Sequence, residues 1–496
     1  MLQEKLDRCL LCHDAPCAKQ CPHHIPVDSI VRSMRFGNAA GAALRLPGQD
    51  CCGTCAAPCE TACLRRNAPV EIRHILAALR AQNLPQPSGA KPDLATTFCG
   101  VRLENPFLLA SSVISSTYEK MARAFDMGWA GASFKTICDF IPQEASPRYA
   151  ASRERLSFEG FKNIEQLSTN TLDEDLDIIR RLKRDYPTKV ILASIMGRDE
   201  AEWERLARLV EDAGADMVEC NFSCPNMMQE GLGSDIGQSA EAVATFTTAA
   251  RRGCRIPLLA KLTPNVTDMP QMGLAAMHSG ADGLAAINTI KSLMGMDLDT
   301  HVTQPNVRGY SGVGGYSGRA VKPIAQRFIW ELASHPQLAG VPITGMGGME
   351  TWQDAVAFLL LGASNVQICT AVMQFGYRII DDLLEGLELY LRSKGLHSPA
   401  ELVGLGGNKV QHLDHLDRSH VCYPRFERSK CLGCGRCHLS CRDGGHEAIT
   451  MRDGRPIMHA KQCVGCHLCV LVCPARAIGV AERGVCLTPS QPGHSL

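Results

Sequence analysis

Short apolar runs alternate with amphipathic helical stretches over residues 98–395. Eight such runs occur, at residues 107–111, 131–135, 189–195, 216–221, 257–262, 283–288, 341–345 and 363–369. Helical patterns, for example over residues 200–213 and 352–361, separate the runs. A strand followed by a helix, repeated eight times over this length, is typical of a (β/α)8 TIM barrel. We therefore predict an α/β fold built on such a barrel; a doubly wound open sheet is the alternative, which eight regular units disfavour.

One of these runs leads into a candidate reactive thiol. Residues 217–221 read as a buried strand, and the loop that follows holds Cys224 beside Pro225. The same loop is rich in glycine, at Gly231, Gly233 and Gly237. A free cysteine is most often a small buried hydrophobic residue, which is the role we expect for Cys220. Cys224 follows a strand end on a movable loop, where an α/β barrel places catalytic groups, and we predict that it is catalytic.

Polar or glycine residues end several of the other runs. The polar ones are Ser111, Lys135, Asn221, Lys261 and Asn288. A single lysine in a strand is usually a snorkelling side chain. Two lysines at equivalent positions of the barrel instead indicate that they bind a ligand. After the last two runs come Gly345-Met346-Gly347-Gly348 and Cys369-Thr370, where barrels commonly bind phosphate through backbone amides. The set predicts a phosphorylated cofactor such as FMN.

The glycine-rich stretch at residues 312–318 has the look of a dinucleotide-binding fingerprint. No strand precedes it, as that fingerprint requires. We expect a flexible loop over the barrel mouth instead.

The overall composition narrows the class of protein. The chain has 496 residues, 45% of them hydrophobic, so more than one domain is expected. Its 51 basic and 51 acidic residues balance, which argues against binding nucleic acid through bulk charge. The sequence has neither an apolar run of membrane-spanning length nor the core of a signal peptide. We therefore expect a cytoplasmic protein with no nucleic-acid or membrane partner.

The 25 cysteines gather at the two ends of the chain in short repeats, which indicates metal clusters rather than disulfides. Within residues 425–484 two C-x2-C-x2-C-x3-C runs have the spacing of a ferredoxin-like domain with two 4Fe-4S clusters. Because the fourth cysteine of each run binds the other cluster, the predicted ligand sets are Cys431, Cys434, Cys437 and Cys473, and Cys463, Cys466, Cys469 and Cys441. Arg442 replaces the usual proline after the first run, which alters the turn but no ligand.

Nine further cysteines lie in the first 63 residues, too many for one structural zinc, although a pair of zinc knuckles is the alternative. We predict an iron–sulfur domain at residues 1–83, a linker at 84–97, a connector at 396–424 and a tail at 485–496. The remaining cysteines without a motif receive no role: Cys99, Cys138, Cys254, Cys422 and Cys486.

Several barrel motifs occur together, including Phe134-Lys135-Thr136, Phe161-Lys162-Asn163-Ile164-Glu165, Cys220-Asn221-Phe222-Ser223-Cys224-Pro225 and Ala286-Ile287-Asn288-Thr289. In combination they resemble the FMN barrel of the dihydropyrimidine dehydrogenase family, especially the catalytic (A) subunit of its bacterial NAD-dependent members. The barrel is also similar to dihydroorotate dehydrogenases. The resemblance implies FMN contacts at Ala110, Ser111, Lys135, Thr136, Lys261, Gly318, Met346, Gly347, Gly348, Cys369 and Thr370. It implies substrate contacts at Asn163, Glu165, Asn221, Ser223, Asn288 and Thr289.

The first 83 residues resemble the α-helical iron–sulfur domain of dihydropyrimidine dehydrogenase and of the glutamate synthase small subunit. The resemblance implies one 4Fe-4S cluster on Cys9, Cys12, Cys17 and Cys63, and most of a second on Cys21, Cys55 and Cys59. The remaining ligand of that family aligns with Leu76, which cannot bind iron, so Cys51 or Cys52 would have to substitute. The FAD and NADPH domains that follow in the resembling enzymes have no counterpart here.

These residue types suit the reduction of an activated pyrimidine double bond. Reduced FMN supplies a hydride, Cys224 supplies the proton, and three asparagines complement the carbonyl and N–H edge of a uracil-like ring. We therefore predict an iron–sulfur flavoprotein oxidoreductase that interconverts uracil or thymine and the 5,6-dihydro forms.

A dihydroorotate dehydrogenase-like or other enoyl-type reductase is the alternative enzyme, and an electron-transfer subunit with a vestigial barrel is the alternative class. Electrons are expected from a separate FAD-containing, NAD(P)H-binding partner subunit or from ferredoxin, within a homo- or hetero-oligomer.

Overall fold

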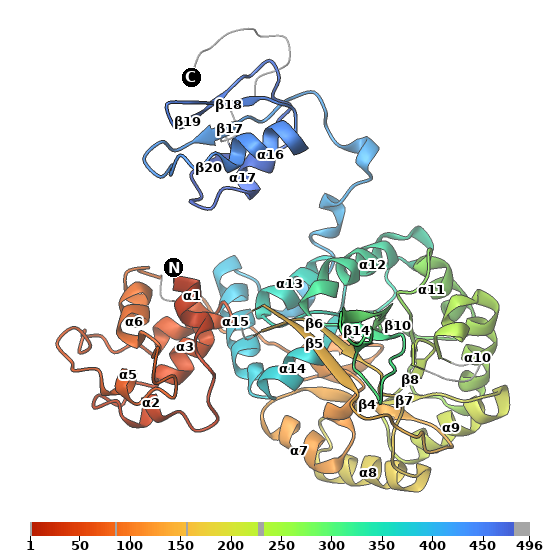
Figure 1. The fold of residues 1–496 in the computed structure, drawn as a ribbon. Coiled ribbons are helices and arrows are strands. Elements are labelled where there is room, and N and C mark those ends of the chain that lie inside the picture. Colours follow the sequence, from red (N-terminus) through yellow and green to blue (C-terminus); the bar gives the residue numbers. More distant parts are fainter. Residues whose placement is uncertain (1, 85–86, 155–156, 227–232, 481–496) are drawn as a thin grey trace. The chain divides into compact units, whose positions relative to one another are not determined.

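The computed structural model describes residues 2–84, 87–154, 157–226 and 233–480. Gly231, Cys486 and the tail at 485–496 lie outside these ranges. The chain divides into two units, residues 1–409 and 410–496 (Figure 1). Within the described residues, no helix is both long and apolar enough to cross a membrane.

The first unit contains a closed barrel of eight parallel strands, which confirms the predicted fold class. Around the barrel the strands are β3 (Phe107–Leu109), β4 (Gly131–Ile137), β7 (Val190–Ile195), β8 (Met217–Asn221), β9 (Leu258–Lys261), β10 (Gly283–Ala286), β15 (Ile343–Met346) and β16 (Asn365–Ile368). All eight coincide with predicted apolar runs. Both faces of these strands are buried, which explains why the runs are nearly continuously apolar.

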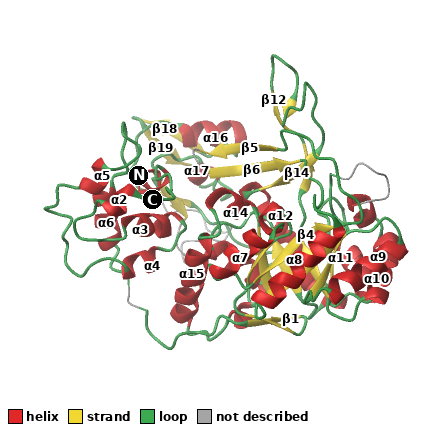
Figure 2. Ribbon diagram, turned by 90° about the horizontal axis from the view of Figure 1, so that it is seen from below, coloured by secondary structure: helices red, strands yellow, loops and turns green. Residues whose placement is uncertain are grey.

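A helical layer surrounds the barrel (Figures 1 and 2). Its helices are α7 (Tyr118–Asp126), α8 (Leu172–Asp185), α9 (Glu200–Asp212), α10 (Ala240–Gly253), α11 (Met269–His278), α12 (Lys322–Ser334), α13 (Trp352–Leu360), α14 (Thr370–Phe375) and α15 (Ile379–Lys394). Capping boxes begin α8 at Thr171 with Glu174 and α13 at Thr351 with Asp354. These caps fix where the chain turns from strand ends into helices.

A four-stranded antiparallel sheet was not predicted. Its strands, in order, are β11 (Ile290–Ser292), β14 (Gly314–Ser317), β6 (Ser157–Asn163) and β5 (Tyr149–Glu154). Two further short pairs are β1 (Thr96–Phe98) with β2 (Val101–Leu103), and β12 (Met294–Met296) with β13 (Thr303–Gln304). The expectation of a flexible loop at residues 312–318 is therefore wrong over β14, because Gly315 and Tyr316 pair with both β6 and β11.

The N-terminal residues form small helices around their own apolar core. These are α1 (Leu2–Asp7), α2 (Pro16–Lys19), α3 (Val27–Arg35), α4 (Ala39–Leu44), α5 (Pro58–Thr61) and α6 (Ile72–Arg80). They contact the barrel through α15: Arg32 Nε lies 2.8 Å from Asp382, and Arg45 Nη2 lies 2.9 Å from Glu385. The Phe36 and Phe375 rings also pack edge to face at 5.0 Å.

In the described residues of the second unit there are two antiparallel strand pairs and two α-helices. The pairs are β17 (Pro424–Phe426) with β20 (Ile478–Val480) and β18 (Ile449–Arg452) with β19 (Arg455–Met458); the helices are α16 (Arg436–Gly444) and α17 (Leu468–Leu471). Its small core is built largely from cysteines, among them Cys437, Cys441 and Cys469.

Candidate active site and cluster sites

A cavity of about 1150 Å³, including its open mouth, lies at the carboxyl ends of the barrel strands. Its walls come from strand ends and from the antiparallel sheet. Every residue predicted to contact the flavin lines it: Ala110, Ser111, Lys135, Thr136, Lys261, Gly318, Met346, Gly347, Gly348, Cys369 and Thr370. Residues far apart in the sequence therefore converge on one space at the barrel mouth.

Most of the predicted substrate residues line the same cavity. They are Asn163, Glu165, Asn221, Asn288 and Thr289, together with Cys224. Ser223 does not line it. This fully buried side chain donates to Asn221 Oδ1 at 2.9 Å and accepts from Asn288 Nδ2 at 2.7 Å. Ser223 thus orients two asparagines from behind the wall.

A chain of hydrogen bonds fixes the central amides. Asn221 Nδ2 donates to Thr136 Oγ1 at 2.9 Å, and Thr136 also contacts the Ser194 hydroxyl at 3.0 Å. Asn221 Nδ2 keeps one hydrogen beyond its bond to Thr136 and can donate it to a ligand, whereas Asn221 Oδ1 and both hydrogens of Asn288 Nδ2 are already used within the protein.

Cys224 is buried, and its loop reaches across to the sheet. Asn226 Nδ2, two residues on, donates to Asn163 Oδ1 at 3.1 Å and to the Glu165 carbonyl at 2.7 Å. Burial raises the pKa of the Cys224 thiol, and the nearby Lys135 and Lys261 charges offset only part of that rise. The thiol is therefore protonated at neutral pH.

The Lys261 ammonium is fixed by a carboxylate inside the barrel. Its Nζ lies 3.0 Å from Glu219 Oε1, and Ser133 Oγ donates to the same oxygen at 2.9 Å. Gln367 Nε2 donates to the other Glu219 oxygen at 3.1 Å. Sequence reasoning did not single out Glu219 or Gln367, although a charged residue within an otherwise apolar strand was an available signal.

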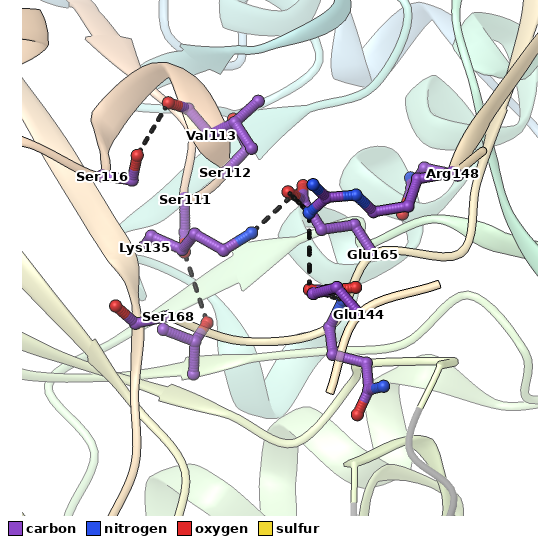
Figure 3. Close-up of polar contacts among 12 residues, drawn as sticks. Ser111, Ser112, Val113, Ser116, Lys135, Glu144, Arg148, Glu165 and Ser168 are labelled. Carbon is purple, nitrogen blue, oxygen red and sulfur yellow. Dashed lines mark hydrogen bonds and ion pairs between the residues drawn. The ribbon is translucent and has the colours of Figure 1, made fainter. Parts of the chain in front are cut away.

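The Lys135 ammonium is paired on the other side of the cavity (Figure 3). Lys135 Nζ lies 3.1 Å from Glu165 Oε2, and Arg148 Nη1 lies 3.4 Å from Glu165 Oε1. Arg148 also approaches Glu144 at 3.9 Å. Glu165 is thus a buried carboxylate between two cations.

The glycines after β15 permit close backbone packing. Gly347 and Gly348 have φ values of +129° and +73°. A Cβ at Gly348 would lie 2.7 Å from the Gly318 carbonyl oxygen, so a side chain does not fit there. Arg319 also lines this part of the cavity. A bare backbone beside an arginine suits the phosphate of a flavin nucleotide.

One acidic group at this end of the cavity was not foreseen. Burial raises the pKa of Glu350 to about 7, although Arg319, whose Nε lies 4.0 Å away, opposes the shift. Other lining residues missed by sequence reasoning are Tyr149, Phe161 and Tyr316. They come from the antiparallel sheet, whose strands pair only in the folded chain.

Three smaller cavities are each lined by four cysteines. In the second unit, one is lined by Cys431, Cys434, Cys437 and Cys473, and another by Cys441, Cys463, Cys466 and Cys469. In the N-terminal domain, the third is lined by Cys9, Cys12, Cys17 and Cys63. The cysteines meet around these spaces in the sets expected for 4Fe-4S clusters. Among the described residues, no group of three or more His, Cys, Asp or Glu side chains is arranged to hold a single metal ion.

Of the five remaining N-terminal cysteines, all but Cys55 lie on the core of that domain. Cys21 and Cys59 are buried, and Cys51 and Cys52 pack against the same apolar cluster. Leu76 is buried within it. The position that aligns with the family's fourth ligand is therefore a core residue.

Comparison with known proteins extends over most of the chain. The dihydroorotate dehydrogenase family profile matches residues 93–391. Residues 1–83 match dihydropyrimidine dehydrogenase domain II with its 4Fe-4S cluster, and residues 425–480 match a 4Fe-4S dicluster domain.

Several curated proteins are similar. The NAD-dependent dihydropyrimidine dehydrogenase subunit PreA of Escherichia coli is 51% identical over 393 residues, which is 79% of this chain and 96% of that protein. The chloroplastic NADP(+) dihydropyrimidine dehydrogenase of Arabidopsis thaliana is 36% identical over 328 residues, 64% of this chain and 77% of the plant protein. The catalytic subunit of dihydroorotate dehydrogenase B from Pyrococcus abyssi is 37% identical over 315 residues, 63% and 98% of the two chains.

Proposed function

Since this chain belongs to the dihydropyrimidine dehydrogenase family of oxidoreductases, with a barrel of the FMN-binding dihydroorotate dehydrogenase type, we propose that it interconverts uracil or thymine and their 5,6-dihydro forms. The observation that carries this proposal is the cavity in which Cys224 lies with Asn163, Asn221 and Asn288 above two buried lysines. Those residues fit both a planar flavin and a pyrimidine ring.

The asparagines provide the recognition. Uracil and thymine present alternating carbonyl and N–H groups, and a carboxamide has both a donor and an acceptor. The bond from Asn288 Nδ2 to Ser223 and that from Asn221 Nδ2 to Thr136 set the direction of each amide before substrate binds. Such preorganisation lowers the entropy cost of binding.

Cys224 serves as the acid in the direction of reduction and as the base in the direction of oxidation. The raised pKa keeps its Sγ protonated, so a proton is available for the ring carbon next to the one that receives hydride. FMN bound in this cavity supplies or accepts that hydride. Lys135, Lys261 and the Gly347-Gly348 backbone are the groups we assign to holding it.

The charge of the cavity favours a neutral pyrimidine base over dihydroorotate, the substrate expected if the chain were instead a dihydroorotate dehydrogenase-like enzyme. The lining lysines among the described residues are Lys135 and Lys261, which lie 3.1 and 3.0 Å from carboxylate oxygens of Glu165 and Glu219. Arg319 lies at the end of the cavity that we assign to the flavin phosphate, 4.0 Å from Glu350. The carboxylate of dihydroorotate would therefore approach lysines already neutralised by Glu165 and Glu219. This observation supports pyrimidine bases.

We assign 4Fe-4S clusters to the three cavities lined by cysteines, and a fourth to Cys21, Cys55 and Cys59 with Cys51 or Cys52. Bound there, the clusters would carry single electrons between the flavin and a separate FAD-containing subunit or a ferredoxin. The similar bacterial protein is itself named as a subunit of an NAD-dependent enzyme, which supports a partner of this kind.

The substrate assignment is tested with anaerobically purified, reconstituted protein and an artificial electron acceptor. Dihydrouracil or dihydrothymine should be oxidised, and dihydroorotate should be turned over much more slowly. Preference for dihydroorotate would favour the alternative enzyme, and no turnover of either class would favour an electron-transfer subunit. Iron and acid-labile sulfide are measured on the same sample; stoichiometric zinc with little sulfide would refute the cluster assignments.

A further inference from the structure

The cavity lined by Cys9, Cys12, Cys17 and Cys63 is closed partly by a residue of the barrel. Arg378 lies between α14 and α15, more than 300 positions from these cysteines, and it lines the same cavity. Family resemblance of the first 83 residues gives no reason to expect a barrel residue there.

The Arg378 guanidinium donates to the backbone of the cysteine loop. Its Nη1 donates to the Cys12 carbonyl at 3.3 Å, and its Nη2 donates to the Leu11 carbonyl. Its Nε donates to the Phe375 carbonyl at 3.3 Å, which anchors the side chain on α14. The barrel therefore holds the loop between two of the cysteines.

A second arginine holds the same loop from the helical domain. Arg35 Nη1 donates to the Cys9 carbonyl at 2.8 Å, and Nη2 donates to Ser157 Oγ of β6 at 3.1 Å. The Arg35 guanidinium also lies over the Phe375 ring, 5.5 Å from its centroid. The loop is thus fixed against the barrel at both ends.

The charge of Arg378 remains uncompensated, in contrast to that of its neighbour. Arg32 lines the same cavity, but its guanidinium lies 2.8 Å from Asp382 and 3.1 Å from Asp381. Within the described part of the chain, Arg378 forms no ion pair, and its donors go to neutral carbonyl groups. Its positive charge therefore acts on whatever occupies the cavity.

We propose that Arg378 is a positioning residue that raises the reduction potential of the cluster held by Cys9, Cys12, Cys17 and Cys63. Reduction adds one negative charge to the cluster, and a nearby cation in a poorly solvated site stabilises the reduced form. This inference rests on the cluster assignment of the proposed function.

The position of Arg378 also connects this cavity to the barrel cavity. Cys369, Thr370, Ala371 and Met373 line the barrel cavity, and Arg378 follows only five residues later. Five residues span at most about 18 Å even when extended. Arg378 therefore acts on a cluster whose cavity is joined to the proposed flavin cavity by a segment of only five residues, from Met373 to Arg378.

The test is an EPR-monitored redox titration of the full chain under anaerobic conditions, with dithionite as reductant. Arg378→Met removes the charge, Arg378→Lys retains it without the forked hydrogen bonds, and Arg327→Met is the control, because Arg327 is half exposed and pairs with Glu331 at 3.5 Å. A Cys17→Ala variant identifies the signals of this cluster by their loss.

At a fixed solution potential, Arg378→Met should raise the ratio of oxidised to reduced cluster about tenfold, which is 59 mV for a one-electron couple. Arg378→Lys should lower the reduction potential of the cluster by less than Arg378→Met does, and Arg327→Met should leave it unchanged. An unchanged potential in Arg378→Met with full iron content overturns the inference but leaves the proposed function intact. If Arg378→Met loses this cluster, the neutral but hydrogen-bonding variant Arg378→Gln is titrated in its place, and an unchanged potential in that variant overturns the inference as well. No signal lost in Cys17→Ala would instead refute the cluster assignment itself.

Discussion

Replacement of Glu219 by glutamine tests the electrostatic design of the barrel interior. Glu219 is fully buried and accepts hydrogen bonds from Lys261, Ser133 and Gln367. Glutamine keeps the shape but removes the charge, so the Lys261 ammonium is left buried without a counter-ion. Breaking a buried pair in this way costs about 3–5 kcal/mol.

The hydrogen bonds themselves largely survive this change. The new amide nitrogen of Glu219→Gln would face Gln367 Nε2, which is a second donor. Gln367 Oε1 is buried without a partner, so rotation of the Gln367 amide would let it accept instead. The loss therefore measures the uncompensated Lys261 charge rather than lost hydrogen bonds.

The assay is thermal unfolding followed by circular dichroism on flavin-free protein. The melting temperature should fall by about 5 °C in Glu219→Gln. The matched control is Glu200→Gln, since Glu200 pairs with Arg252 at 3.1 Å on the surface and should matter by less than about 1 kcal/mol. The double variant Glu219→Gln/Lys261→Met should regain most of the stability, because a buried pair replaced by apolar groups is often neutral. Equal melting temperatures for Glu219→Gln and Glu200→Gln would refute this reasoning.

Three other predictions follow from the site and the core. Cys224→Ala should retain flavin and clusters but lose about 100- to 10,000-fold in turnover of uracil or dihydrothymine. The control Cys220→Ala, which changes a cysteine within a buried strand, should keep a turnover near that of the wild type. Comparable rates for the two variants would exclude Cys224 as the proton donor. The isolated chain should not oxidise NADH or NADPH at a useful rate until a partner subunit or reduced ferredoxin is supplied, and rapid bleaching of its flavin by NADH in stopped flow would reveal a nicotinamide site. Burial raises the pKa of Asp175 to about 6 from 3.8. The native state therefore binds this proton more tightly than the unfolded state does. Protonated Asp175 stabilises the fold at low pH, and this contribution to the free energy of unfolding is lost as the pH rises through 6. Urea unfolding of wild type should therefore lose about 1 kcal/mol more between pH 5 and 7.5 than that of Asp175→Asn, and parallel pH profiles would contradict the shift.

Local pattern was sufficient for the barrel strands and for the grouping of the C-terminal cysteines, whereas the N-terminal grouping rested on the family resemblance. Each barrel strand is buried on both faces, so its run is apolar without interruption, and a helical period follows it. The cysteines meet in quartets because the spacing within a short loop restricts which thiols can reach one space, as Cys431, Cys434 and Cys437 do. Glycines such as Gly348 are likewise explained by a backbone approach of 2.7 Å that no side chain allows.

The tertiary structure alone decided which charges neutralise one another and which residues share a wall. Lys135 with Glu165, Lys261 with Glu219, and Arg378 with the carbonyls of Leu11 and Cys12 are separated by 30, 42 and more than 360 positions, respectively. In the four-stranded sheet, β14 pairs with β6, which lies about 150 positions earlier in the chain, and with β11, so these pairings are also non-local. Sequence determined these residue types and their local conformations, whereas their partners depend on how the barrel closes, because contact between distant segments is a property of the folded chain and not of any window of sequence.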